Sequence, residues 1–163
     1  MSYKIGDVII HWTYGIGTIV AIEEKTIGGE ARLYYAIEVE LFKYWVPVEE
    51  SDTCAIHTPI ESDQFEPLFD ILRTPGENLP DHQYERKNEL RERMHKKTLG
   101  DLCHVIRDLT DRSHSHNLNL DDSFVLNQAK EHLLDEWVLS FGVQRSNAQD
   151  ELKVLLQGDS ILV

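Results

Sequence analysis

The stretch Arg32-Leu33-Tyr34-Tyr35-Ala36-Ile37-Glu38-Val39 determines how the first half of this 163-residue chain is expected to fold. Taking every second residue puts Leu33, Tyr35, Ile37 and Val39 on one side, and a more polar set on the other. This period of two is typical of a β-strand with one buried face. We therefore predict a strand that packs one face against a core.

Short apolar runs on either side of this stretch predict further strands. They occupy residues 8–10, 16–22, 44–46 and, with a weaker pattern, 53–56. Gly28-Gly29 lies between the second and third runs, where a tight hairpin needs positive φ. Short strands at this spacing are typical of a small twisted β-barrel of roughly sixty residues.

After Pro59 the apolar residues follow the period of helices. Ser62 is a suitable cap for a first helix, and a polar helix is expected from about residue 80 to residue 97. Ser146 is expected to cap a last short helix. The second half is therefore predicted to be helical.

Two further helix starts have a stronger signature. Thr98 with Asp101, and Asn119 with Asp122, have the three-residue spacing of a capping box. Gly142 is a natural stop for the second of these helices. The residues expected to face inward are Leu102, Val105, Ile106 and Leu109 in one helix, and Leu126, Ala129, Leu133 and Trp137 in the other.

Together these patterns predict an α+β chain in which the strands precede the helices. A small β-barrel is expected over residues 1–58 and a compact helical domain over residues 59–163. No stretch approaches the roughly 20 apolar residues that a membrane span needs. The N-terminus also lacks the apolar core of a secretory signal, so we expect a cytoplasmic protein.

The formal net charge of −13 argues against autonomous DNA binding, because affinity for nucleic acid comes largely from Lys and Arg. Residues 1–60 contain four basic and nine acidic side chains. Six basic side chains fall between Arg86 and Lys97, against only Glu89 and Glu92. This segment is either a phosphate-binding helix or a solvated helix face with internal ion pairs.

Several motifs resemble those of the CarD/CdnL family of bacterial RNA polymerase-binding transcription factors. The order and spacing of these motifs over most of the chain carry the resemblance. They are Ile5-Gly6-Asp7-Val8-Ile9-Ile10, Thr26-Ile27-Gly28-Gly29-Glu30, Val46-Pro47, Phe69-Asp70-Ile71-Leu72-Arg73-Thr74-Pro75 and Val105-Ile106-Arg107-Asp108-Leu109. The first part is also similar to a domain of transcription-repair coupling factors, which lack the helical half.

The resemblance implies that residues 1–58 form a Tudor-like domain that binds the polymerase β subunit by sheet extension. Trp45 stands where family members often have a basic contact residue. The polymerase-binding residues implied by position are Lys25, Ile27, Arg32, Tyr34, Tyr35 and Trp45.

The resemblance also implies that the helical half contacts promoter DNA near the upstream edge of the transcription bubble. Family members insert a tryptophan into the minor groove there. In this chain Gln83 occupies the matching position, next to Tyr84. The implied DNA-binding residues are Gln83, Tyr84, Arg86, Lys87, Arg91, Arg93 and Lys97.

The residues offer little support for an enzyme, a cofactor or a metal site. His114 and His116 form the only close histidine pair, and we interpret them as loop residues. Cys103 and His104 are neighbours on a helix and point about 100° apart, so they do not form a nucleophile and base. Cys54 and Cys103 are interpreted as structural.

Two functions follow from these expectations. The first is a regulator that binds the polymerase β subunit, modulates open promoter complexes and makes weak DNA contacts that depend on the polymerase. The alternative is a polymerase-binding protein–protein adaptor without DNA binding, which the net charge and the missing tryptophan favour. Neither function involves a membrane or a cofactor.

Overall fold

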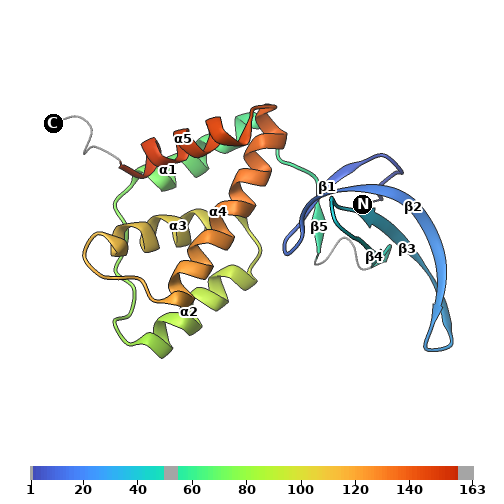
Figure 1. Ribbon diagram of the computed structural model, residues 1–163, viewed down its shortest axis with the longest axis horizontal. Coiled ribbons are helices and arrows are strands. Elements are labelled where there is room, and N and C mark those ends of the chain that lie inside the picture. Colours follow the sequence, from blue (N-terminus) through green and yellow to red (C-terminus); the bar gives the residue numbers. More distant parts are fainter. Residues whose placement is uncertain (1, 50–54, 158–163) are drawn as a thin grey trace. The chain divides into compact units, whose positions relative to one another are not determined.

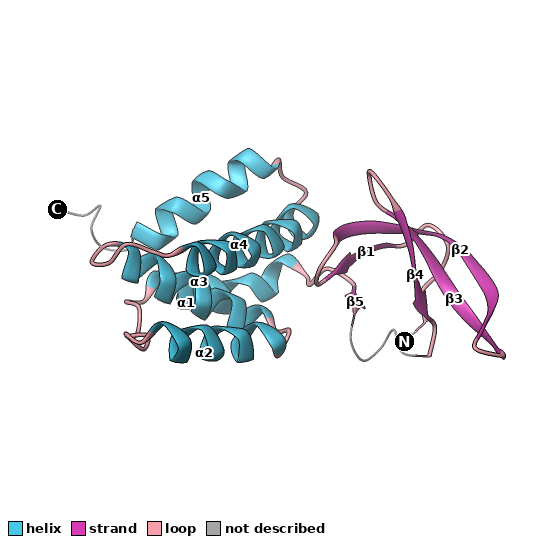
Figure 2. Cartoon of the chain, turned by 60° about the horizontal axis from the view of Figure 1, so that its bottom comes forward, coloured by secondary structure: helices cyan, strands magenta, loops and turns pink. Residues whose placement is uncertain are grey.

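A computed structural model of the chain describes residues 2–49 and 55–157. The chain divides into two compact units, Met1–Pro59 and Ile60–Val163. Strands form the first unit and helices the second, as Figure 2 shows. The predicted α+β class, with strands before helices, is confirmed.

The first unit contains one antiparallel sheet with the strand order β4-β3-β2-β1-β5. Within the described residues the two end strands, β4 and β5, do not pair with each other, so the sheet is not closed into the predicted barrel. The weakest predicted strand is reduced to two residues, and residues 53 and 54 lie outside the described part. The strands are β1 Val8–His11, β2 Gly15–Ile27, β3 Glu30–Glu38, β4 Lys43–Pro47 and β5 Ile56–His57.

The β2–β3 hairpin is longer than the sequence pattern predicts, and it extends beyond the other strands (Figure 1). Its turn consists of Gly28 and Gly29, with φ of 66° and 85°. Both values lie in the left-handed region that glycine adopts without steric cost, as a two-residue hairpin requires. Ile27 and Glu30 pair directly across this turn.

The core of the first unit lies on one face of this sheet. Ile19, Tyr35 and Ile37 are buried there, as the alternation in β3 predicts. Leu33, from the same predicted face, is 53% exposed because it lies on the projecting part of the hairpin. The period of two therefore identifies the buried face of the strand correctly. It does not show which residues on that face lie beyond the core and are exposed.

The helical unit has its core between α1, α3 and α4, where Leu72, Ile106, Leu133 and Trp137 are almost completely buried. Among the described residues, none of its helices has the length and apolar character needed to cross a membrane. Its elements are the 3-10 helix η1 Ser62–Phe65 and the helices α1 Glu66–Arg73, α2 Gln83–His95, α3 Leu99–Ser113, α4 Leu120–Phe141 and α5 Arg145–Gln157.

Both predicted capping positions of the long helices are confirmed. The backbone N–H of Asp101 donates to Thr98 Oγ1 at 3.1 Å, and that of Asp122 donates to Asn119 Oδ1 at 2.8 Å. Gly142 ends α4 with φ of 64°, as predicted.

The caps predicted for the first and last helices are wrong. Glu61, one residue before Ser62, is the N-cap of η1 and forms a reciprocal capping box with Gln64. Ser146 lies inside α5, which begins at Arg145. A serine near a helix start predicts that a helix begins there, but its local hydrogen bonds decide the register.

Candidate functional site

The β4 strand offers a free edge, since it is an end strand of the sheet in residues 2–49 and 55–59. Val48 N–H donates to the carbonyl of Leu33, and Val39 N–H donates to that of Phe42. Hydrogen-bonded pairs alternate along an antiparallel ladder, so Tyr44 and Val46 also bond to β3.

The same alternation determines which backbone groups face outward. Lys43 and Trp45 lie between the hydrogen-bonded positions, so their N–H and C=O groups point to the free edge. Pro47 adds a carbonyl but no N–H, as is common for proline on an edge strand. This edge can therefore hydrogen-bond to a strand from another chain.

Trp45 is held in a defined position on the outer face beside this edge. Its indole Nε1 donates to Glu23 Oε2 at 3.0 Å, and Lys25 Nζ lies 3.4 Å from its ring centroid. Lys43 Nζ is 5.9 Å from the same centroid. The side chain remains 39% exposed, so a positioned aromatic ring and two ammonium groups border the free edge.

The other predicted polymerase-binding residues do not all lie on this edge. Arg32 pairs opposite Lys25 on the hairpin and bonds to Glu30 at 3.2 Å. Ile27 is 62% exposed at the hairpin tip. Tyr34 is half-buried, in a strand that pairs with β4 on one side and β2 on the other.

Tyr35 was assigned to the interface by position, and the structure contradicts that role. Only 1% of its surface is exposed, and its hydroxyl accepts the backbone N–H of Tyr3 at 3.0 Å. β3 is an interior strand from Tyr34 to Glu38, so the exposed edge expected from Arg32 to Ile37 is largely paired. We therefore expect the interface at the free edge of β4 and not on β3.

In the helical unit, Arg86 is not available to a phosphate. It is buried, and its guanidinium bonds to Asp122 at 3.0 Å and to the carbonyls of Pro80 and Asp81. The predicted phosphate-binding role is wrong because Arg86 shares its helix face with the buried Leu90.

Arg93 lies about two turns beyond Arg86 on the same inner face. Its Nη1 is 2.7 Å from Asp108 Oδ2, and its Nη2 is 3.3 Å from Glu89 Oε1. Although burial alone would lower the pKa of Arg93, its bonds to Asp108 and Glu89 raise that pKa above its usual value. This arginine is a structural cation as well.

Lys97 does not continue the helix, as the sequence had suggested. α2 ends at His95, and Lys97 has a φ of 56° in the left-handed region. The polar helix predicted to reach residue 97 is therefore shorter at its C-terminal end than expected.

The remaining predicted DNA-binding residues lie on the outer side of α2. Gln83 and Arg91 are exposed, and Tyr84 is 67% exposed. Lys87 forms a surface ion pair with Asp121, at 3.5 Å. Because Tyr84, Lys87 and Arg91 follow helical spacing, they form one exposed stripe.

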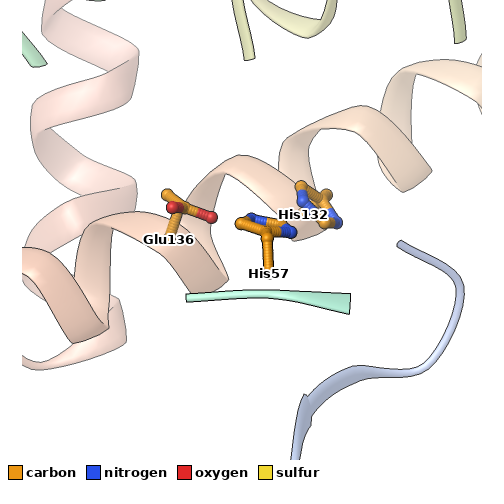
Figure 3. Close-up of side chains that lie close together, drawn as sticks. All are labelled: His57, His132 and Glu136. Atoms are coloured by element: carbon orange, nitrogen blue, oxygen red, sulfur yellow. The ribbon is translucent and has the colours of Figure 1, made fainter. Parts of the chain in front are cut away.

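Buried polar side chains of α4 also have a structural use that the sequence did not indicate. Figure 3 shows Glu136 and His132 one turn apart on this helix. The carboxylate of Glu136 accepts the backbone N–H of Ile60 at 2.8 Å, and Ser140 donates to the carbonyl of Ile60 at 2.6 Å. Both bonds fasten the beginning of the helical unit to α4.

The pairs rejected as catalytic or metal-binding have other contacts. His104 Nδ1 lies 2.9 Å from the carbonyl of Gly100. Burial raises the pKa of the Cys103 thiol to about 12, which keeps it unreactive. His116 bonds through Nδ1 to Ser115 at 2.8 Å. Cys54 lies outside the described residues.

Comparison with known proteins gives matches over both units. Residues 3–58 match the family model described as "CarD-like/TRCF RID domain", and residues 67–153 match "CarD, C-terminal domain". The chain is similar to "Putative transcription factor YdeB" of Bacillus subtilis (strain 168), with 28% identity over 152 residues. That alignment covers 86% of this chain and 94% of the relative.

Proposed function

Since the chain belongs to the CarD family of transcription factors, we propose that it is a non-enzymatic regulator that binds the β subunit of bacterial RNA polymerase. The observation that carries this proposal is the free β4 edge, with the backbone groups of Lys43 and Trp45 pointing outward. Strand addition to such an edge supplies main-chain hydrogen bonds, and the flanking side chains supply specificity. The protein would act in the cytoplasm, where the polymerase is.

The helical unit would then modulate open promoter complexes through weak DNA contacts. Gln83, Tyr84, Lys87 and Arg91 are the residues of α2 that remain accessible for this role. Binding to polymerase holds them near the promoter, so a high local concentration compensates for weak affinity. Contacts that are stronger in the open complex than in the closed one shift the equilibrium toward the open state.

A second candidate function is an adaptor that binds polymerase without touching DNA. It is favoured by the internal neutralisation of Arg86 and Arg93, which makes two of the predicted DNA-binding cations unavailable to phosphates. The net charge of −13 also favours this function, because an acidic protein is repelled by the phosphates of DNA.

Calorimetric titration of the full-length chain with an N-terminal fragment of the cognate β subunit tests polymerase binding. We expect saturable binding, which Lys25→Glu weakens roughly tenfold because the cation lies beside the edge. Lys4→Glu is the matched control, as Lys4 is exposed near β1. An absence of binding at low salt, with the chain folded, refutes the docking proposal.

Fluorescence anisotropy with labelled promoter DNA separates the two functions. The regulator predicts an added, salt-sensitive DNA contact only when polymerase is present. The adaptor predicts that the polymerase binds the promoter DNA with the same affinity whether or not the chain is bound to it.

A further inference from the structure

The helical unit contains a cavity of about 340 Å³ that the proposed function does not use. Three segments of this unit surround it: the loop after α1, one face of α3 and the end of α5. A cavity of this size is large enough for a small molecule. The residues that matter for its chemistry are Thr74 and Gly76 in the loop, Arg107, Asp111 and His114 in α3, and Leu156 in α5.

The wall formed by the loop and α3 is held together by direct contacts. Arg107 Nη1 donates to Thr74 Oγ1 at 2.8 Å, and the backbone N–H of Glu77 donates to Asp108 Oδ1 at 2.9 Å. A Cβ atom at Gly76 would lie only 2.6 Å from Asp111 Cβ, so the loop packs directly on the helix. This part of the cavity is therefore formed before any ligand binds, as is usual for small-molecule sites.

The guanidinium of Arg107 is buried but only partly bonded. Its side chain is 9% exposed, and its Nε donates to Asp108 Oδ1 at 3.0 Å. Its Nη2 is buried and has no hydrogen-bond partner among the residues that the structure describes. Because Nη2 carries two N–H donors, and a buried donor without an acceptor is unfavourable, an acceptor beside Arg107 would be stabilising.

The nearest carboxylate does not supply this acceptor, because its oxygens already have other donors. Asp108 Oδ1 accepts from Arg107 Nε and from the backbone of Glu77, and Asp108 Oδ2 accepts from Arg93 at 2.7 Å. Asp108 is also completely buried and cannot turn toward the cavity. The N–H groups of Arg107 Nη2 therefore remain for a group that enters from the cavity.

The other charged groups of the cavity limit how tightly an anion can bind. Asp111 lines the same space from α3 and repels a negative charge. Arg73 lines it too, but its Nη1 is bonded to Glu66 and Asp70. His114 adds an exposed imidazole that can donate an N–H. Binding would thus depend on the directed N–H groups of Arg107, and not on a strongly positive cavity.

We infer that this cavity binds a small ligand through a carboxylate or phosphate group that accepts the N–H groups of Arg107 Nη2. Hydrogen bonds from a guanidinium to either group are charge-assisted and stronger than neutral ones. Since the loop, α3 and α5 all line the cavity, the ligand would stabilise their packing and so the folded helical unit. The inference goes beyond the proposed function, and it requires neither polymerase nor DNA.

NMR titration of the full-length, ¹⁵N-labelled chain with sodium phosphate, and separately with sodium acetate, tests this site at constant ionic strength. At least one anion should cause saturable shifts of the Arg107 Nε–H signal and of the backbone amides of Gly76 and His114. We expect affinity in the millimolar range, because Asp111 opposes the anion. The anion that binds shows whether the ligand group is a phosphate or a carboxylate.

Two variants change the cavity without touching the bonds of Arg107. Asp111→Asn removes the repulsion and should tighten binding roughly threefold. Asp63→Asn is its control, at an exposed aspartate of η1 outside the cavity. Leu156→Trp should fill the cavity and abolish binding. Val154→Trp is its control, since Val154 is 57% exposed on the same helix and does not line this cavity.

Circular dichroism confirms that each variant is folded. Saturable shifts at Arg107 that tighten in Asp111→Asn and vanish in Leu156→Trp, with both controls like the wild type, support the site. The inference is overturned if neither anion gives saturable shifts, or if the shifts centre on other residues. It is also overturned if binding persists in Leu156→Trp or is unchanged in Asp111→Asn.

Discussion

Two pairs of basic residues, one pair in each unit, are in opposite situations. In the strand unit, Lys25 and Lys43 lie beside an aromatic ring at the free edge of a sheet. In the helical unit, Arg86 and Arg93 are turned inward and bonded to Asp122 and Asp108. The helical segment has more basic residues, but only some of them, such as Lys87 and Arg91, are exposed. A count of charges along a sequence is therefore a poor measure of the charge available to a partner.

The buried arginines give the largest expected effect. Asp122→Ala leaves the guanidinium of Arg86 buried without its carboxylate, and should lower the free energy of unfolding by about 3–5 kcal/mol. Urea denaturation measures this. Asp121→Ala, at the surface pair with Lys87, is the matched control and should cost about 0–1 kcal/mol. If both variants lost the same free energy of unfolding, the distinction between structural and exposed cations in this unit would not hold.

A second substitution tests whether the binding aromatic lies in the strand unit. Trp45→Ala should weaken binding to the β-subunit fragment by about 2 kcal/mol, roughly thirtyfold, because an aromatic anchor at an interface centre contributes strongly. Tyr84→Ala, at an exposed aromatic residue of the helical unit, should leave this affinity unchanged. Titration calorimetry measures both. The reverse pattern would place polymerase docking in the helical unit.

The smallest expected effect concerns DNA. Lys87→Gln combined with Arg91→Gln should reduce the affinity of the polymerase-bound chain for promoter DNA a few-fold at physiological salt. If each residue contacts one phosphate, the slope of log K against log salt should fall by about 1.8. Anisotropy titrations over a salt series measure this slope. An unchanged slope would favour the adaptor without DNA contact.

Much of the fold could be predicted from local patterns. The alternation in residues 32–39, the Gly28-Gly29 turn and the Thr98 and Asn119 caps each depend on a few neighbouring residues, and all are found in the structure. Closure of the barrel depends on pairing between distant strands, and the described residues show an open sheet. Sequence periodicity contains no information about which strand lies at an edge.

The site was harder to predict, for the same reason. Arg86 and Arg93 were expected to bind DNA, but Leu90 lies on the same helix face and indicates that this face is buried. Their partners, Asp122 and Asp108, are 36 and 15 residues away, beyond any local pattern. The Glu23 contact that positions Trp45 is also a pairing across strands. Tyr35 was taken as a contact on the resemblance alone, although the alternation in residues 32–39 placed it on the face predicted to pack against a core.

Amide hydrogen exchange of β4, followed by NMR with and without the β-subunit fragment, tests the docking edge most directly. In the free chain the outward N–H groups of Lys43 and Trp45 should exchange fast, and the N–H groups of Tyr44 and Val46 should exchange slowly. Binding by strand addition should protect Lys43 and Trp45 and leave the other two unchanged. Binding without protection at Lys43 and Trp45 would contradict the account, because the partner would then dock elsewhere than on the free edge of β4.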